Sequence, residues 1–76
     1  MELTDFISKL ALAFEDTESN SIKPDAKFRD IEGYSSLVAL SIMAVVDEEY
    51  NVQLKGDDIR KAITVEDLFN TVNAKL

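Results

Sequence analysis

Apolar side chains recur at steps of three and four residues along three stretches of this chain, a spacing that favours helices over strands. In the first stretch, about residues 2–15, one helical face collects Leu3, Phe6, Ile7, Leu10, Ala11 and Phe14. The 76 residues include no cysteine, so neither a disulfide nor a thiolate metal site can reinforce the fold. We therefore expect one small all-α domain over residues 1–76, stabilised by the packing of its helices.

A second helix is predicted over about residues 36–50, with Ser35 as its N-cap, because a serine hydroxyl can accept from a free first-turn N–H. Its core face is predicted to hold Ala39, Ile42, Met43, Val46 and Tyr50. A second stripe, bordered by Ser36 and Asp47, consists of Leu37, Leu40 and Ala44. Either several neighbouring elements surround this helix or the second stripe awaits a partner.

The rest of the chain predicts one short helix, one longer helix and a long connection. Residues 57–61 suit a short helix presenting Ile59, and residues 64–67 resemble a capping box that opens a helix to about residue 74. Residues 16–35 show no sustained period and are interrupted by Pro24 and Gly33. Three apolar residues are expected to anchor this connection to the core, namely Ile22, Phe28 and Ile31.

Charge and composition exclude several classes of function. Fifteen acidic residues against eight basic ones give a net charge of −7, which would repel nucleic acids and anionic membrane surfaces. No apolar run is long enough to span a bilayer and no signal peptide is evident, so a cytoplasmic protein is expected. Without histidine or cysteine there is no Ser-His or Cys-His pair, which leaves a carboxylate enzyme as the weakest alternative.

The acidic side chains themselves have two interpretations. They can attract a basic protein partner, or they can simply aid solubility. The clusters at residues 47–49 and 57–58 lack the alternating ligand spacing and central glycine of a calcium loop. We therefore expect solvated carboxylates there and no metal site.

A motif in the middle of the chain resembles a known family. Gly33-Tyr34-Ser35-Ser36-Leu37, followed by a helix ending in Asp47-Glu48-Glu49-Tyr50, is similar to the acyl carrier protein family around its modified serine. Ala26-Lys27-Phe28 resembles the segment where that family places a buried phenylalanine, and Lys61–Val65 resembles the entry to its last helix. The resemblance needs no gap from Asp25 to Val72.

The resemblance implies a small four-helix bundle that catalyses nothing by itself. Ser36 would receive a 4′-phosphopantetheine arm from coenzyme A through a phosphopantetheinyl transferase. Acyl or aminoacyl groups would then be carried as thioesters to acyl-loading, condensing or modifying enzymes with basic docking patches, in fatty-acid, polyketide-like or related biosynthesis. A monomer is expected, and its partner-binding residues would be Ser35, Leu37, Leu40, Ser41, Ala44, Asp47, Glu48 and Ile59.

The residues support Ser36 independently, because a phosphodiester anion is favoured at a helix N-terminus. Three features depart from the family pattern. Ser35 stands where the family has Asp, Tyr34 replaces a small residue, and Val38 and Ser41 stand where acidic residues are common. Tyr34 either packs within the loop or faces the arm or a partner. The alternative function is an unmodified helical interaction module, a degenerate carrier.

Overall fold

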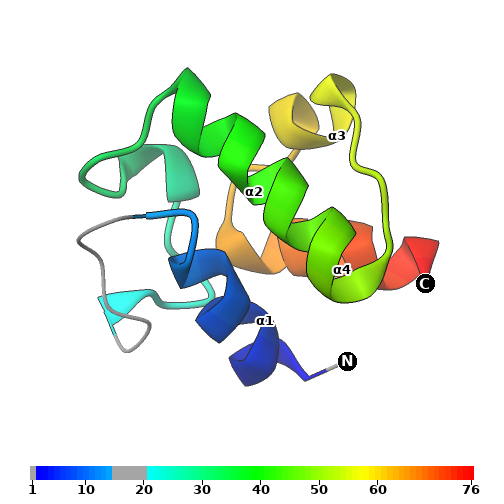
Figure 1. Cartoon of the computed structure of the whole chain (residues 1–76). Coiled ribbons are helices and arrows are strands. Elements are labelled where there is room, and N and C mark those ends of the chain that lie inside the picture. The colour runs from blue at the N-terminus through cyan, green and yellow to red at the C-terminus, as the bar shows by residue number, and fades with distance from the viewer. Residues whose placement is uncertain (1, 15–20) are drawn as a thin grey trace.

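The computed structural model describes residues 2–14 and 21–76, and in these ranges the chain is helical without a named strand. Four α-helices follow in order: α1 (Leu3–Ala11), α2 (Ser36–Tyr50), α3 (Gly56–Lys61) and α4 (Val65–Lys75). One 3-10 turn, η2 (Phe28–Asp30), lies in the connection between α1 and α2. Figure 1 shows α1 running antiparallel to α2, with α4 behind them and α3 beside α2. The predicted all-α fold is confirmed.

Helix α1 packs against both α2 and α4, and α3 packs against α4. The predicted inward faces of the longer helices are confirmed, since Phe6, Ile42 and Leu68 are almost completely buried. Removal of so much apolar surface from water is the main force that holds this small bundle together. The buried core comprises Phe6, Ile7, Leu10, Ala13, Phe14, Ile22, Phe28, Ile42, Val46, Val52, Leu54, Ile59, Ala62, Val65, Leu68 and Val72.

The end of α1 differs slightly from the expectation. The helix ends at Ala11, although the apolar pattern continues through Phe14. Backbone hydrogen bonds from Ala13 N–H to the Leu10 carbonyl and from Phe14 N–H to the Ala11 carbonyl, both 3.0 Å, continue the chain as tight turns. These turns keep Phe14 pointing inward, so the periodicity persists after the α-helix has ended.

The connection before α2 is attached to the start of α4. The amide of Val65 donates to the Ala26 carbonyl and the amide of Glu66 donates to the Pro24 carbonyl, each at 2.9 Å, and Lys27 and Thr64 form an isolated antiparallel bridge. Two of the predicted anchors, Ile22 and Phe28, are buried, and the third, Ile31, packs against the core while half-buried. The connection is therefore held at defined points and delivers the chain to α2 in a fixed place.

Both ends of α2 agree with the predicted limits. Gly33 has φ +91°, a left-handed conformation that suits glycine, and it lies just before the extended N-cap Ser35. At the other end Asn51, also left-handed at φ 56°, donates its amide to the Asp47 carbonyl. No helix in residues 2–14 and 21–76 is long and apolar enough to cross a membrane.

Candidate functional site at the start of α2

Two adjacent serines at the start of α2 have different structural roles. The Ser35 Oγ accepts a hydrogen bond from the Val38 amide at 3.3 Å, so Ser35 is the N-cap, as predicted. Ser36 is the first residue of the helix, and its side chain is exposed. The Ser36 hydroxyl makes no hydrogen bond within the described part of the chain. Of the two hydroxyls, only that of Ser36 can be modified without removing the cap.

The surroundings of Ser36 suit an anion. The first turn of α2 contains no acidic side chain, so the positive end of the helix dipole is not already neutralised there. Within residues 2–14 and 21–76, the amides of Ser36 and Leu37 have no protein acceptor. A phosphodiester on the Ser36 Oγ would lie beside these amides and the dipole. The donors present at Ser36 therefore fit a phosphopantetheine group.

The aromatic residue before the two serines belongs to the loop packing. The Tyr34 ring lies 5.8 Å from the Phe28 ring centroid in an edge-to-face arrangement and 6.5 Å from the Phe14 ring. Tyr34 is half-buried, and its amide donates to the Ile31 carbonyl at 3.0 Å. Of the two roles left open by the sequence, packing within the loop is the one that its contacts show. This packing supports the backbone immediately before the first turn of α2.

The predicted docking stripe is exposed along α2. Leu37 is 74% exposed and Leu40 is 61% exposed, which are large values for leucine side chains in a bundle. Ala44, Asp47 and Glu48 are also exposed, Ser35 is exposed and Ser41 is half-buried. The side of α2 away from the core thus begins with apolar side chains beside Ser36 and ends with carboxylates.

One predicted member does not belong to this surface. Ile59 is only 6% exposed and is part of the hydrophobic core, so its proposed role as a docking contact is corrected. The reason is that α3 has a single buried side chain and must use Ile59 to attach itself to the bundle. Sequence reasoning instead missed Ile63, which follows α3 and is 54% exposed. Its position between two helices gave no periodic signal.

The carboxylates near the end of α2 are not equivalent. Glu49 forms an ion pair with Lys9 of α1 at 3.3 Å, and the Tyr50 hydroxyl donates to Asp5 at 3.1 Å. Burial and the neighbouring Asp5 raise the pKa of Tyr50 to about 12. Asp47 and Glu48 form no ion pair with a described residue, which leaves their charges available to solvent or a partner. Among described residues, no group of three or more acidic side chains is arranged to hold a metal ion.

Comparison with known proteins is consistent with this geometry. A sequence profile described as "Phosphopantetheine attachment site" matches residues 5–72. The acyl carrier protein of Nitratidesulfovibrio vulgaris is 25% identical over 75 residues, covering 99% of both chains. That of Chlorobium phaeovibrioides is 26% identical over 74 residues, covering 97% of this chain and 95% of the relative. The chain therefore belongs to the phosphopantetheine attachment-site family and is a carrier domain rather than a catalyst.

Proposed function

We propose that this chain is an acyl carrier protein whose phosphopantetheine arm is attached to Ser36. The observation that carries this proposal is the division of roles between the two serines. Ser35 is occupied as the N-cap, and Ser36 is exposed beside amides that have no acceptor among the described residues. When bound, the group supplies a thiol, absent from the polypeptide, on which acyl or aminoacyl groups are held as thioesters. The chain's own part is to present the serine hydroxyl and to hold the adjacent anion at the positive end of α2.

The partners implied are a phosphopantetheinyl transferase and the enzymes that load, extend or modify the carried group, in fatty-acid, polyketide-like or related biosynthesis. Leu37, Leu40 and Ala44 offer an apolar centre, and Asp47 and Glu48 offer a charged rim. Such a surface is complementary to a small apolar patch flanked by basic residues on the partner. We expect a cytoplasmic monomer. Size-exclusion chromatography with light scattering measures the oligomeric state.

The experiment is intact-mass and peptide-mass analysis after incubation with coenzyme A and a transferase of broad specificity. The wild-type chain should gain one phosphopantetheine on the peptide that contains Ser36. Ser36→Ala should abolish the gain, whereas Ser35→Ala should retain part of it because only the helix cap is lost. Attachment to Ser35 would overturn the assignment.

The alternative is a degenerate carrier that acts as an unmodified interaction module. The observation that favours it is Ser35 in place of the family's aspartate, which removes a negative charge next to the attachment site. The cap itself is preserved, because serine and aspartate cap helices about equally well. A wild-type chain that stays folded but gains no mass with the active transferase would favour this alternative.

A further inference from the structure

Helix α3 is too short to be stable by itself. It spans six residues, and Ile59 is the single buried side chain within it. Isolated helices of this length do not form in water, so α3 depends on contacts at its ends. At its N-terminal end the Lys55 amide donates to Asp58 Oδ2 at 2.8 Å, and Lys75 of α4 lies 3.6 Å from the same carboxylate.

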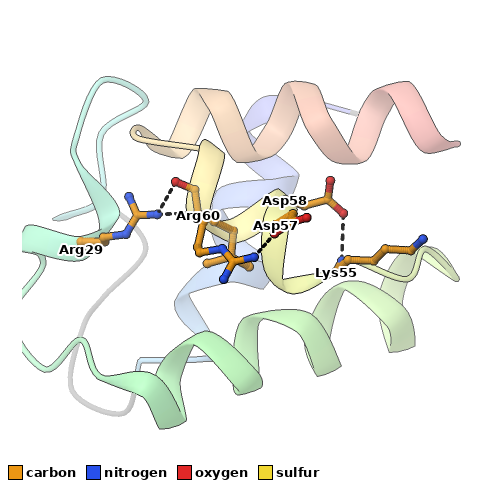
Figure 2. Close-up of polar contacts among 6 residues, drawn as sticks. Arg29, Lys55, Asp57, Asp58 and Arg60 are labelled. Atoms are coloured by element: carbon orange, nitrogen blue, oxygen red, sulfur yellow. Dashed lines mark hydrogen bonds and ion pairs between the residues drawn. The ribbon is translucent and has the colours of Figure 1, made fainter.

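Its C-terminal end is held by a side chain from a distant part of the sequence. Arg29 Nη1 donates to the Ala62 carbonyl at 2.8 Å, and Nη2 donates to the carbonyls of Ile59 at 2.5 Å and Arg60 at 3.0 Å. Figure 2 shows the guanidinium reaching across to the last turn of α3. Carbonyls at the end of a helix lack intrahelical partners, and a cation there is also favoured by the helix dipole.

Arg29 is itself held in place. It lies in η2, its guanidinium carbon sits 4.8 Å from the centroid of the Phe28 ring, and that ring is completely buried. Lys27, two residues earlier, bridges to Thr64 at the start of α4. The same turn leads through Gly33 to Ser36. One short segment thus connects the last turn of α3 with the first turn of α2.

Resting on the function proposed above, we propose that Arg29 is a positioning residue for the modification of Ser36. Its clamp on the last turn of α3 sets where α3 and the exposed Ile63 lie relative to Leu37, so that the transferase meets one fixed surface around Ser36. In both figures α3 lies beside α2, and α3 packs against α4. A lysine cannot replace the clamp, because one ammonium on a flexible stem lacks the rigid fork of donors.

The first measurement is amide hydrogen exchange of the full chain. In Arg29→Ala, exchange of the amides of residues 58–62 should accelerate about tenfold or more, because the charge-assisted hydrogen bonds from Arg29 to the carbonyls of Ile59, Arg60 and Ala62 are all lost. Exchange in α1 and α4 should stay unchanged. Lys27→Ala is the matched control. Lys27 lies two residues before Arg29 and carries the same charge, but its side chain forms no ion pair with a described residue. Unchanged exchange of α3 in Arg29→Ala would overturn the clamp.

The second measurement is the steady-state kinetics of arm transfer by the transferase. If Arg29→Ala leaves α3 in its docked position only about one third of the time, the apparent affinity of the transferase falls by the same fraction, so KM should rise about threefold. The value of kcat should stay unchanged, because Ser36 and its cap are intact. Arg29→Lys should restore the charge but neither the protection of α3 nor the full KM. Full recovery of KM without recovery of protection would show that Arg29 acts through its charge, and the proposal would be withdrawn.

These outcomes separate the inference from the function on which it rests. A wild-type chain that is never modified would contradict the proposed function, and the positioning role of Arg29 would be contradicted with it. Hydrogen exchange of α3 in Arg29→Ala would still show whether Arg29 holds the last turn of α3. A modified wild type for which Arg29→Ala and Lys27→Ala show the same KM contradicts the positioning role alone.

Discussion

Helices α2 and α4, whose N-cap side chains each accept a backbone hydrogen bond, begin in opposite ways. At α4 the Thr64 Oγ1 accepts from the Asp67 amide at 3.1 Å, while Asp67 Oδ2 accepts from the amides of Thr64 and Ile63, each at 3.0 Å. The next two amides, of Val65 and Glu66, donate to the connection before η2. Every free donor of this end is thereby used inside the protein.

Among described residues, the only side-chain cap at α2 is the hydrogen bond from the Val38 amide to the Ser35 hydroxyl, and the first turn carries no carboxylate. The comparison shows that an amide in the first turn of a helix can either donate to an acceptor inside the protein or remain free for a bound anion, but not both. The start of α4 is closed and joins the connection to the bundle, whereas the start of α2 is left open where Ser36, the proposed attachment residue, lies. Within residues 2–14 and 21–76, the amides of Ser36 and Leu37 have no protein acceptor, so the start of α2 keeps donors that an anion can use.

The largest test of this contrast uses the apolar residue in each first turn. Val65 is completely buried, so Val65→Ala should lower the free energy of unfolding by about 2 kcal/mol. Leu37 is 74% exposed, so Leu37→Ala should leave the urea midpoint nearly unchanged. It should instead weaken arm transfer or partner binding by about 1 kcal/mol or more, because a partner that covers Leu37 loses the apolar contact area that the truncation removes.

Circular dichroism and binding must be measured on the same preparations. A largely unfolded Leu37→Ala chain would show that Leu37 supports the core, and the docking surface on α2 would then be withdrawn. Ile42→Ala, which truncates a completely buried residue on the other side of α2, is the positive control for loss of stability.

The caps themselves give the next largest effect. Thr64→Ala removes one member of a reciprocal pair and should cost about 1 to 2 kcal/mol, whereas Ser35→Ala removes a single longer bond and should cost about 0.5 to 1 kcal/mol. Urea unfolding at neutral pH measures both. Equal costs, or a larger cost at Ser35, would show that the start of α2 is as tightly built as that of α4.

Much of this architecture is predictable because it depends on local rules. The limits of α2 at residues 36 and 50 agree with the prediction, and the capping box at Thr64 forms even though aspartate replaces the usual longer acid. Phe28 was predicted as an anchor and is completely buried. For α2 and the capping box the signal lies within a few residues, in helical spacing or in a cap motif. Phe28 lies in a stretch without sustained periodicity and was predicted from its apolar side chain and from the family resemblance.

The contacts that escaped prediction connect distant residues. Arg29 stands in a stretch without periodicity, and the carbonyls that it binds are 30 to 33 residues away, so no local pattern pairs them. Ile59 was assigned to the surface because a single apolar residue in a short helix has no face to define. Ser36 was predicted as the attachment residue through the family resemblance, whereas the different roles of Ser35 and Ser36 became visible only in the hydrogen bonds.

The third test uses acid. Hydrogen bonds from the amides of Thr64 and Ile63 hold the pKa of Asp67 below its usual value of 3.8. Because the folded pKa is lower than the unfolded one, the stabilisation is complete above the unfolded value and is lost as the pH falls through the folded value. The difference in melting temperature between wild type and Asp67→Asn should therefore shrink below about pH 4.

The start of α2 supplies the control for this measurement. Ser35→Ala removes a cap that does not titrate, so its difference from wild type should stay constant over the same acid range. Asp58, whose pKa is also lowered, chiefly by the Lys55 amide, is retained in both variants and cancels in the comparison. A parallel loss in both variants would show that acid acts on the whole molecule rather than on the α4 box.

The smallest expected effect concerns the charged rim of α2. Glu48 is exposed and forms no ion pair with a described residue, so its charge should act on a basic partner mainly during encounter. Glu48→Lys should slow association by roughly twofold at low salt, equivalent to about 0.5 kcal/mol, and the defect should fade as salt screens it. Stopped-flow association at two ionic strengths measures this, and Glu66→Lys in the closed first turn of α4 controls for net charge. If both variants slowed equally, the overall charge of −7 would steer the partner, and the open side of α2 would contribute only its apolar contacts.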